Sequence, residues 1–313
     1  MKILSGQLDT TKGDIVITPG QRLSVLEQDH FKYDDNVVMD TVIMGNERLF
    51  QIMKEKDAIY AKEDFSDEDG IRASELEAEF AEMDGWEAES NAAMLLNGLG
   101  IGTEFHYSLM KDLDGSLKVK VLLAKALFGN PDILLLDEPT NYLDAEHIEW
   151  LKRYLNEYEN AFILISHDIP FLNSVINLIY HMDNQELTRY VGDYDKFQEV
   201  YAMKKSQLEA AYNRQQKEIA DLKDFVARNK ARVSTRNMAM SRQKKLDKMD
   251  VIELAAEKPK PEFSFKEGRT TGRIIFETKD LIIGYDEPLS KPLNLSMERG
   301  EKVALIGANG IGK

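Results

Sequence analysis

Two adjacent carboxylates at the end of an apolar run are the residues best suited to chemistry in this sequence. Ile133-Leu-Leu-Leu136 predicts a short buried strand, and Asp137 and Glu138 follow it directly. Carboxylates that leave a buried strand are unfavourable unless a cation or a reacting group stands beside them. We therefore expect Asp137 to hold Mg²⁺ beside a phosphate chain and Glu138 to activate an attacking water as a general base.

Two further polar residues follow predicted strands. His167 comes after the apolar run Ala161–Ile165, within Ser166-His-Asp168, and could donate a hydrogen bond to a phosphate and help position the water. Gln28 comes after the run Arg22–Leu26, and its amide oxygen could complete the Mg²⁺ ligands. A lone glutamine or histidine is usually structural, so both predictions depend on the neighbouring motifs.

The end of the sequence has the spacing of a phosphate-binding loop. It follows the apolar run Val303–Ile306, and its backbone N–H groups could cradle phosphates while a lysine reaches the β and γ oxygens. The expected ligands are Gly307, Asn309, Gly310, Gly312 and Lys313. The hydroxyl residue that usually comes next, to contact Mg²⁺, is not in the sequence. Tyr285 could stack on adenine, or equally be a core tyrosine at a strand edge.

Composition narrows the class of protein. The chain has 313 residues, 43% of them hydrophobic, which leaves room for about two domains. It has no cysteine, so disulfides and thiolate metal sites are excluded. No apolar window approaches the roughly 18–20 residues needed to cross a bilayer. These features predict a cytoplasmic protein without a membrane segment.

The net charge of −15 is unevenly distributed. Residues 62–89 hold twelve acidic and two basic residues, whereas residues 228–248 hold eight basic residues and one acidic residue. The first segment repels phosphate and the second attracts it, so the mean charge does not exclude nucleic acid as a partner. The candidate nucleic-acid contacts are Arg228, Lys230, Arg232, Arg236, Arg242, Lys244, Lys245 and Lys248.

The periodicity predicts an α/β protein with two helical additions. Strands and helices alternate from 118 to 192, which is typical of a mainly parallel sheet, and Asp14–Thr18 predicts an earlier strand. Residues 46–97 predict acidic surface helices. From 193 to 253 apolar residues recur at steps of three and four, which predicts a long helical hairpin with a basic tip.

Together, these motifs resemble an ATP-binding cassette ATPase. The run Leu-Leu-Leu-Asp-Glu-Pro-Thr-Asn with Asp144, the Ser-His-Asp sequence and Gln28 carry the resemblance. The hairpin between two cassette-like regions is similar to the linker of the ABC-F family, and the nearest branch is YbiT-like. The resemblance implies an ATP-binding cassette fold, ATP and Mg²⁺ as cofactors, ATP hydrolysis, and action on the ribosome through rRNA or tRNA.

One departure from the family pattern concerns its signature loop, Leu-Ser-Gly-Gly-Gln. This chain has Leu113-Asp-Gly-Ser-Leu117, so only Leu113 and Gly115 keep the pattern, with Ser116 as a possible replacement for the missing hydroxyl. Asp114 should repel the γ-phosphate. Gly115, Ser116 and Asp144 are accordingly the expected contacts to nucleotide on this side.

The resemblance also predicts the domain boundaries. Residues 1–192 should form a first cassette without its N-terminal strands and phosphate loop, with an arm at about 46–105. A basic linker should occupy 193–271, and 272–313 should begin a second cassette. Such a fragment should be a weak ATPase or none, because cassette portions needed for a complete ATP site are missing. Alternatively, Val303–Ile306 could lie beside Ile133–Leu136 and complete the first cassette.

Two other functions remain open. The chain could be the ATP-binding subunit of a membrane transporter, although transporter cassettes rarely carry a 60-residue hairpin between two cassettes. It could also be a catalytically inert helical scaffold. Ribosome binding that weakens with rising salt would favour the ATPase that acts on the ribosome over the transporter subunit.

Overall fold

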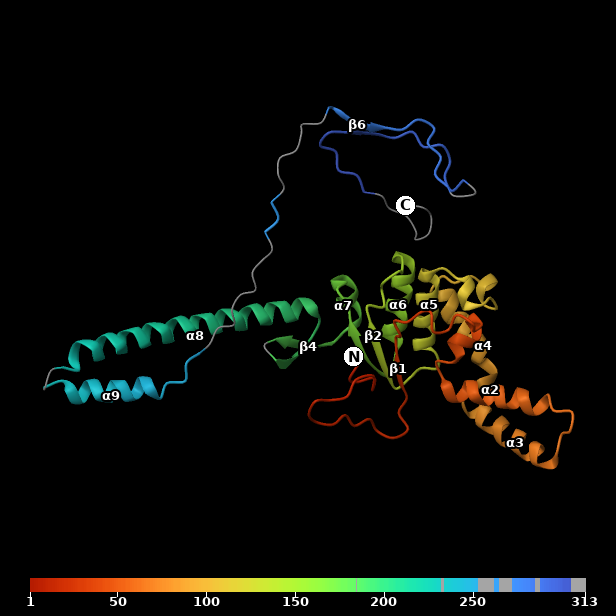
Figure 1. Cartoon of the computed structure of the whole chain (residues 1–313), viewed down its shortest axis with the longest axis horizontal. Coiled ribbons are helices and arrows are strands. Elements are labelled where there is room, and N and C mark those ends of the chain that lie inside the picture. Colours follow the sequence, from red (N-terminus) through yellow and green to blue (C-terminus); the bar gives the residue numbers. More distant parts are fainter. Residues whose placement is uncertain (184, 232–233, 253–261, 265–271, 285–287, 305–313) are drawn as a thin grey trace. The chain divides into compact units, whose positions relative to one another are not determined.

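Three of the predicted strands form one parallel sheet in the computed structural model of this chain (Figure 1). The strands β1 (Leu23–Val25), β2 (Ile133–Asp137) and β3 (Ala161–Ile165) lie in that order, so β2 is paired on both sides. The leucines of β2 are fully buried because a central parallel strand is covered on both faces. The structure describes residues 1–183, 185–231, 234–252, 262–264, 272–284 and 288–304.

Four helices in the first part of the chain pack with this sheet or with one another. They are α1 (Val38–Ile43), α4 (Ala88–Gly98), α5 (Gly115–Leu127) and α6 (Ala145–Glu157). Helix α5 contacts α1, α4 and β1, and the Ser24 hydroxyl donates to the Ala126 carbonyl at 2.8 Å. Their core is aliphatic, as the sequence predicts. Short 3₁₀ turns lie at Gly85–Glu87 (η1), Thr103–Phe105 (η2) and Met110–Asp112 (η3).

The acidic segment forms a helical hairpin, the arm, made of α2 (Glu47–Tyr60) and α3 (Asp67–Glu82), which lie side by side (Figure 1). Asn46 caps the first helix, and Ser66 with Asp69 forms a capping box on the second. Ile52 and Leu76 are fully buried between the helices, so the arm is not polar on all faces. Cross-helix ion pairs join Arg48 to Glu79, Arg72 to Glu55 and Lys56 to Glu77.

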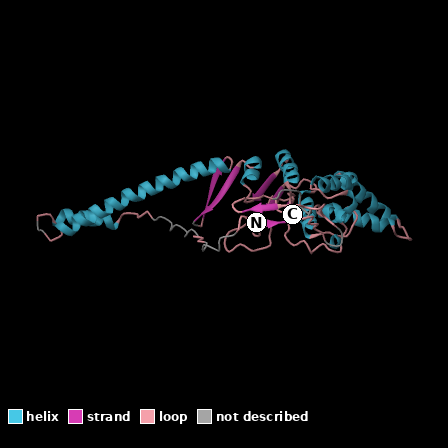
Figure 2. Ribbon diagram, turned by 90° about the horizontal axis from the view of Figure 1, so that it is seen from above, coloured by secondary structure: helices cyan, strands magenta, loops and turns pink. Residues whose placement is uncertain are grey.

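The chain divides into two compact units, one of residues 1–171 and 270–313 and the other of residues 172–269. The second contains most of α7 (Ile169–Val175) and the antiparallel strands β4 (Leu178–Asp183) and β5 (Glu186–Val191). The ring of Phe197 lies 5.1 Å from His181 and 5.0 Å from Tyr190, so this β-hairpin packs against the start of the following helix (Figure 2).

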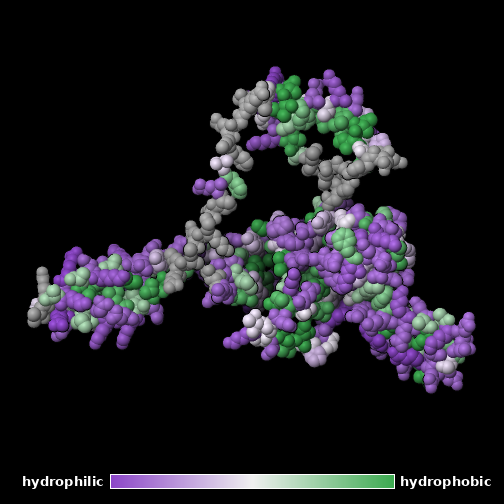
Figure 3. All heavy atoms as spheres, viewed as in Figure 1, coloured by the Kyte–Doolittle hydropathy of each residue, from purple (hydrophilic) through white to green (hydrophobic). Residues whose placement is uncertain are grey.

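A second helical hairpin follows, made of α8 (Tyr194–Asn229) and α9 (Arg236–Asp247), which lie side by side (Figure 1). Helix α8 has 36 residues and is about 54 Å long at 1.5 Å per residue. Figure 3 shows hydrophobic residues between the two helices and hydrophilic ones on the outer surface, as expected for a paired seam.

The returning helix is shorter than the periodicity predicts. Met249 and Ile252 continue the apolar spacing, but α9 ends at Asp247. The amide of Gln215 on α8 donates to the Asp250 carbonyl at 2.7 Å and accepts from the Ile252 N–H at 2.8 Å. These side-chain bonds satisfy backbone groups that would otherwise pair within a helix, so the helix does not continue to Ile252.

The two remaining strand predictions, Asp14–Thr18 and Val303–Ile306, differ in outcome. Asp14–Thr18 is not a strand, since this exposed segment has no neighbouring strand to pair with in the described part of the chain. Antiparallel strands β6 (Ile274–Glu277) and β7 (Ser296–Glu298) lie in the last part. The placement of Val303–Ile306 beside Ile133–Leu136 stays a prediction, because Leu305 and Ile306 lie outside the described residues; among the described residues, the neighbours of β2 are β1 and β3. No helix in the described residues is long and apolar enough to span a membrane.

Candidate functional site

The candidate site lies where the three parallel strands end. The register pairs Val25 with Leu135 and Asp137 with Ile165, so the three strands run in step and their carboxyl ends meet at one edge of the sheet. Gln28 follows β1, Asp137 ends β2 and His167 follows β3. Ligands of open parallel sheets bind outside this edge. The topology therefore brings together residues that lie far apart in the sequence.

Gln28 and Asp137 are in direct contact. The Gln28 Nε2 group donates to Asp137 Oδ2 at 3.1 Å. Both side chains line a cavity of about 350 Å³ whose wall also includes Lys2 and Ser5 of the first turn and Lys32. The carboxylates of Glu27, Asp29 and Asp137, the Gln28 amide and the ammonium groups of Lys2 and Lys32 thus line one hollow, and this mixture of charges suits a cation held together with an anionic ligand.

Glu138 and His167 form a second pair. The His167 Nδ1 atom lies 2.7 Å from Glu138 Oε2, and the His167 backbone N–H lies 3.4 Å from the same oxygen. With Glu138 ionised, the ring proton is assigned to Nδ1, because this nitrogen faces the carboxylate. The sequence predicted that both residues would act on one water, and the structure places them in contact.

The backbone of Glu138 is in the left-handed region, with a φ of 51°. Its N–H donates to the Ile165 carbonyl of β3 at 2.8 Å, which fixes the residue beside the neighbouring strand. A side chain with a Cβ costs about 1–2 kcal/mol in this region, so the surrounding contacts must enforce it. The strain turns Glu138 out of the strand direction that Asp137 follows.

Ser166 and Asp168 have a structural role that the sequence analysis did not predict. The Asp168 N–H donates to Ser166 Oγ at 3.1 Å, and the Phe171 N–H donates to Asp168 Oδ1 at 3.0 Å. Phe171 is fully buried. Ser166 and Asp168 therefore fix the turn into α7, which carries His167 at a defined position. The sequence signal for such a turn is a pair of short polar residues, here Ser166 and Asp168, directly before a helix.

The departure in the signature loop has a physical reason. Asp114 is the N-cap of α5 and accepts the Leu117 N–H at 2.9 Å, so its charge lies on the positive end of the helix. Gly115 and Ser116 form the first turn, where Gly115 is exposed. Burial lowers the pKa of Lys120, and the nearby carboxylates Asp144 and Asp114 partly oppose that shift.

Asp144 has a similar role at the next helix. It is the N-cap of α6, and its Oδ1 accepts the His147 N–H at 3.2 Å. Burial raises the pKa of Asp144, but the His147 N–H, the His147 ring and Lys120 lower it further, so the net shift is downward. Within the described residues, no hydrogen bond joins Asp144, Gly115 or Ser116 to the Gln28–Asp137 or Glu138–His167 pair.

Glu27 is a residue that sequence reasoning missed. Its carboxylate accepts from Lys125 Nζ at 3.1 Å, from the Tyr33 hydroxyl at 3.0 Å and from Lys32 Nζ at 3.4 Å. Burial alone would raise the pKa of Glu27, but Lys125 and its other donors lower it overall. No local pattern could have revealed this group, because Lys125 lies 98 residues away.

The remaining predicted nucleotide contacts fall outside the described part of the chain. They are Tyr285 and the loop residues Gly307, Asn309, Gly310, Gly312 and Lys313, whose roles stay predictions. In the described part, no group of three or more His, Asp or Glu side chains gathers as a metal site. Mg²⁺ usually takes one or two carboxylates together with substrate phosphates and waters, and the oxygens of Asp137 and Gln28 fit that need.

The basic residues of the second hairpin fall into two groups. Arg228 pairs with Asp224 at 2.9 Å and Lys245 pairs with Glu218 at 2.6 Å. No carboxylate partner is found, among the described residues, for Lys230, Arg236, Arg242, Lys244 and Lys248. The guanidinium of Arg242 lies 3.5 Å from the Phe225 ring centroid. Arg232 lies outside the described residues.

Two cations of α8 join this surface and were not predicted. Arg214 and Lys217 line a groove of about 320 Å³ together with Arg242 of α9 and with the acidic residues Glu218 and Asp221. Arg214 and Lys217 lie before the basic run in the sequence and among acidic neighbours, so charge counts along the sequence did not identify them. The cations of the hairpin therefore extend beyond its tip, with acidic residues of α8 among them.

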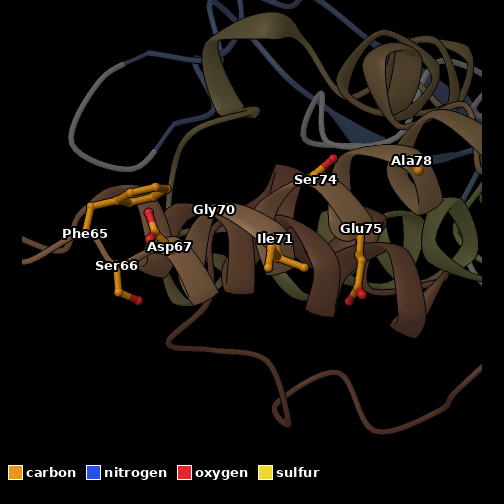
Figure 4. A pocket seen from close by; sticks show the side chains of 8 residues that line it. All are labelled: Phe65, Ser66, Asp67, Gly70, Ile71, Ser74, Glu75 and Ala78. Carbon is orange, nitrogen blue, oxygen red and sulfur yellow. The ribbon is translucent and has the colours of Figure 1, made fainter.

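A larger hollow of about 780 Å³ lies on the arm (Figure 4). Phe65, Ile71 and Ala78 line it with Asp67 and Glu75, whose carboxylates are shown there as sticks. Its lining holds no basic residue that would attract a phosphate. We do not assign it to the candidate site.

Comparison with known proteins identifies the family to which the chain is similar. Two family profiles, both described as ABC transporter, match residues 1–141 and residues 180–265. The chain is 58% identical to YfmM of Bacillus subtilis, an uncharacterized ABC transporter ATP-binding protein, over 100% of this chain and 61% of that protein. It is 45% identical to YkpA of the same organism, also described as an uncharacterized ABC transporter ATP-binding protein, over 99% and 58%.

A third relative is the probable ATP-binding protein YbiT of Escherichia coli O157:H7. The chain is 42% identical to it, over 100% of this chain and 59% of YbiT. The chain therefore spans 58% to 61% of the length of these three relatives.

Proposed function

Because this chain belongs to the ATP-binding cassette family, in the ABC-F branch of its YfmM-, YkpA- and YbiT-like members, we propose that it binds and hydrolyses ATP and acts on the ribosome in the cytoplasm. The observation that carries the ATPase part is the meeting of Gln28, Asp137, Glu138 and His167 at one edge of the sheet. The observation that supports a nucleic-acid partner is a group of cations on the α8–α9 hairpin for which no carboxylate partner is found among the described residues.

Asp137 and Gln28 are the residues proposed to hold Mg²⁺. When bound, the ion would neutralise charge on the β and γ phosphates. The Gln28 amide now donates its NH₂ group to Asp137, and rotation of the amide would present its oxygen instead. Asp137 keeps its second carboxylate oxygen for a ligand or water.

Glu138 is the proposed general base. Its carboxylate would accept the proton of the attacking water, while the Nδ1–H group of His167 holds the same carboxylate in place at 2.7 Å. The strained φ of Glu138 turns this side chain away from Asp137, so one group can face the cation and the other the water. A general base in such a position contributes roughly 10²- to 10⁴-fold to the rate.

The domain organisation follows from the same proposal. Residues 1–192 form the cassette that carries this site, with the arm inserted at about 46–105. Residues 193–271 form the linker, and residues 272–313 begin a second cassette whose phosphate loop contacts nucleotide. In this arrangement Gly115, Ser116 and Asp144 contact nucleotide from the side of the first cassette.

The hairpin is proposed to contact rRNA or tRNA through phosphate. Lys230, Arg236, Lys244 and Lys248 have no carboxylate partner among the described residues, so they are free to replace the counterions of a nucleic-acid backbone. The acidic arm would be repelled by the same backbone. The charge segregation thus favours one orientation of the protein on RNA.

Cosedimentation tests this function against its main alternative. Purified protein is centrifuged with ribosomes, or with lipid vesicles of the same organism's membranes, in the presence of ATP. We expect the protein in the ribosome pellet at about 50 mM salt, with less of it at 200 mM, because phosphate contacts weaken with salt. Recovery with membranes and not with ribosomes would favour a transporter subunit, and recovery with neither, without ATP binding, an inert scaffold.

A further inference from the structure

Helix α5 carries lysines among its buried apolar residues: Lys118 and Lys120 are buried, and Lys125 is largely buried. Lys118 is 5% exposed, and the side chain of Lys125 is 14% exposed, on a helix that otherwise buries Val121, Leu122 and Leu123. Burying an ammonium group is unfavourable unless an anion stands beside it with good geometry. An apolar residue at either position would avoid that cost. Stability of the fold alone therefore does not explain why lysines occupy these two positions.

Both lysines have their partners on one short segment. Lys125 Nζ lies 3.1 Å from Glu27 Oε1, and Lys118 Nζ lies 2.5 Å from Asp34 Oδ1. The lysines are seven residues apart, which is about two helical turns, so they project from the same face of α5. Their partners are also seven residues apart, on the segment that contains Gln28.

Further contacts hold the same segment on the helix. The Lys118 ammonium lies 5.2 Å from the Phe31 ring centroid, and the Lys125 ammonium lies 4.9 Å from that of Tyr33. The backbone N–H of Lys111, just before α5, donates to the Asp34 carbonyl at 3.0 Å. The segment from Glu27 to Asp34 is thus attached along its length and not at one point.

This attachment decides where the Gln28 amide lies. Gln28 is flanked by Glu27, which is held by Lys125, and its own side chain lies on an exposed loop. A long side chain on a free loop would lose much rotamer freedom in keeping its 3.1 Å bond to Asp137. Helix α5 begins at Gly115 and Ser116, which are expected nucleotide contacts. The helix therefore links these residues to the segment that carries Gln28.

We propose that Lys118 and Lys125 are positioning residues that fix the Gln28 loop to α5, so that the Gln28 amide is kept at Asp137 and moves with the first turn of α5. The consequence for Mg²⁺ rests on the proposed ATPase function, whereas the position of the amide does not. A change at the start of α5 is then transmitted to the cation site through two ion pairs.

The test observes the Gln28 amide directly in the full chain. The ¹H–¹⁵N signals of its side-chain NH₂ group are assigned by their absence from Gln28→Glu and then compared in Lys118→Met, Lys125→Met, Lys125→Arg and Lys111→Met. We expect both buried Met variants to move the signals toward those of a free glutamine, and Lys125→Arg to restore them. Lys111→Met removes an equal charge at an exposed neighbouring position and should leave them unchanged.

A second measurement separates positioning from simple stabilisation. Loss of a positioning residue around a metal ligand typically weakens metal binding by roughly 10- to 100-fold. We expect Lys125→Met to raise the Mg²⁺ concentration for half-maximal ATP hydrolysis about tenfold, with a smaller change in the KM for ATP. A residue that only stabilised the fold would leave this Mg²⁺ requirement unchanged.

The outcomes distinguish the two proposals. Unmoved Gln28 signals in folded Lys118→Met and Lys125→Met would overturn the positioning role, whatever the ATPase result. Shifted signals in a protein that neither binds nor hydrolyses ATP would keep the positioning role and overturn the proposed function. If the Met variants do not fold by circular dichroism, Glu27→Gln and Asp34→Asn remove the same ion pairs from the partially exposed side and take their place.

Discussion

At the scale of single residues, the site depends on one strained position. Glu138 has a φ of 51° and bonds through its N–H to β3, so its carboxylate leaves the strand toward His167. The neighbouring Asp137 stays within β2 and reaches Gln28 instead. Two adjacent carboxylates thereby acquire two different partners, and the backbone strain is the physical means of separating them.

Replacing Glu138 should expose this strain as a difference in stability. Glu138→Gly and Glu138→Ala both remove the carboxylate, but only glycine relieves the cost of a Cβ at positive φ. Glycine also gives the unfolded chain more conformational entropy, which offsets part of this gain. We therefore expect the free energy of unfolding of the Gly variant to exceed that of the Ala variant by about 0.5–1 kcal/mol. Urea unfolding followed by circular dichroism measures the difference; an equal or lower midpoint for glycine contradicts it.

The residues of the site were predictable, but their contacts were not. Apolar runs of four or five residues, each followed by a polar residue, are local patterns, and they identified Gln28, Asp137, Glu138 and His167. The Glu138–His167 bond spans 29 residues and the Gln28–Asp137 bond spans 109. Such contacts depend on strand order, which the periodicity of a single strand does not specify.

At the scale of elements, the two helical hairpins share one design, an apolar seam with ion pairs across it. The arm buries residues such as Ile52 and Leu76 between helices that are joined by pairs such as Arg72–Glu55. The α8–α9 hairpin buries Val226 and Ala239, and Lys245 of α9 pairs with Glu218 of α8. The sequence predicted both hairpins, but it predicted a longer α9, because the two bonds from Gln215 are long-range side-chain contacts.

The ion pairs predict that the arm is sensitive to acid. Hydrogen bonds from Lys62 and Ser66 lower the pKa of Asp69 to about 2, and hydrogen bonds from Arg48 and Lys56 lower the pKa of Glu79 and of Glu77. A carboxylate whose folded pKa is lowered stabilises the fold above its ordinary value and loses that effect as the pH falls. The stabilisation is therefore complete above pH 4.5 and declines toward about pH 2.

Hydrogen exchange of residues 67–82, corrected for the intrinsic rate, should show this loss of protection between pH 5 and about pH 3. The effect should be small and weaker at high salt, because the pairs lie at the surface. In Arg72→Met, which removes the pairs to Glu55 and Glu75, protection should already be reduced at neutral pH. Protection that is constant with pH in the wild-type protein would show that the ion pairs do not hold the arm.

At the scale of the whole molecule, charge is divided between the parts of the chain. A net charge of −15 coexists with a hairpin whose cations are largely unpaired among the described residues. Ion pairing divides those cations further, since Arg228 and Lys245 have carboxylate partners, whereas none is described for Arg236, Arg242 and Lys244. The sequence could not separate these two groups, because the Lys245–Glu218 pair joins different helices.

Neutralising the unpaired group should weaken ribosome binding more than neutralising the paired group. We expect Arg236→Gln, Arg242→Gln and Lys244→Gln together to reduce the slope of log K against log salt by roughly 2 to 3, since each phosphate that is no longer neutralised lowers it by about 0.7–0.9. Arg228→Gln with Lys245→Gln is the matched control and should change the slope less. Equal slopes for the two sets would show that the unpaired cations do not contact phosphate.

Hydrolysis of ATP by Glu138→Gln, measured beside ATP binding, tests most directly whether Glu138 is the general base. We expect the variant to bind labelled ATP with the affinity of the wild-type protein and to release phosphate at least about 100-fold more slowly, because the general base is removed while the shape of the side chain is kept. Glu159→Gln, at an exposed position before β3, should hydrolyse ATP at the wild-type rate. Hydrolysis by Glu138→Gln at the wild-type rate would contradict the assignment of this site.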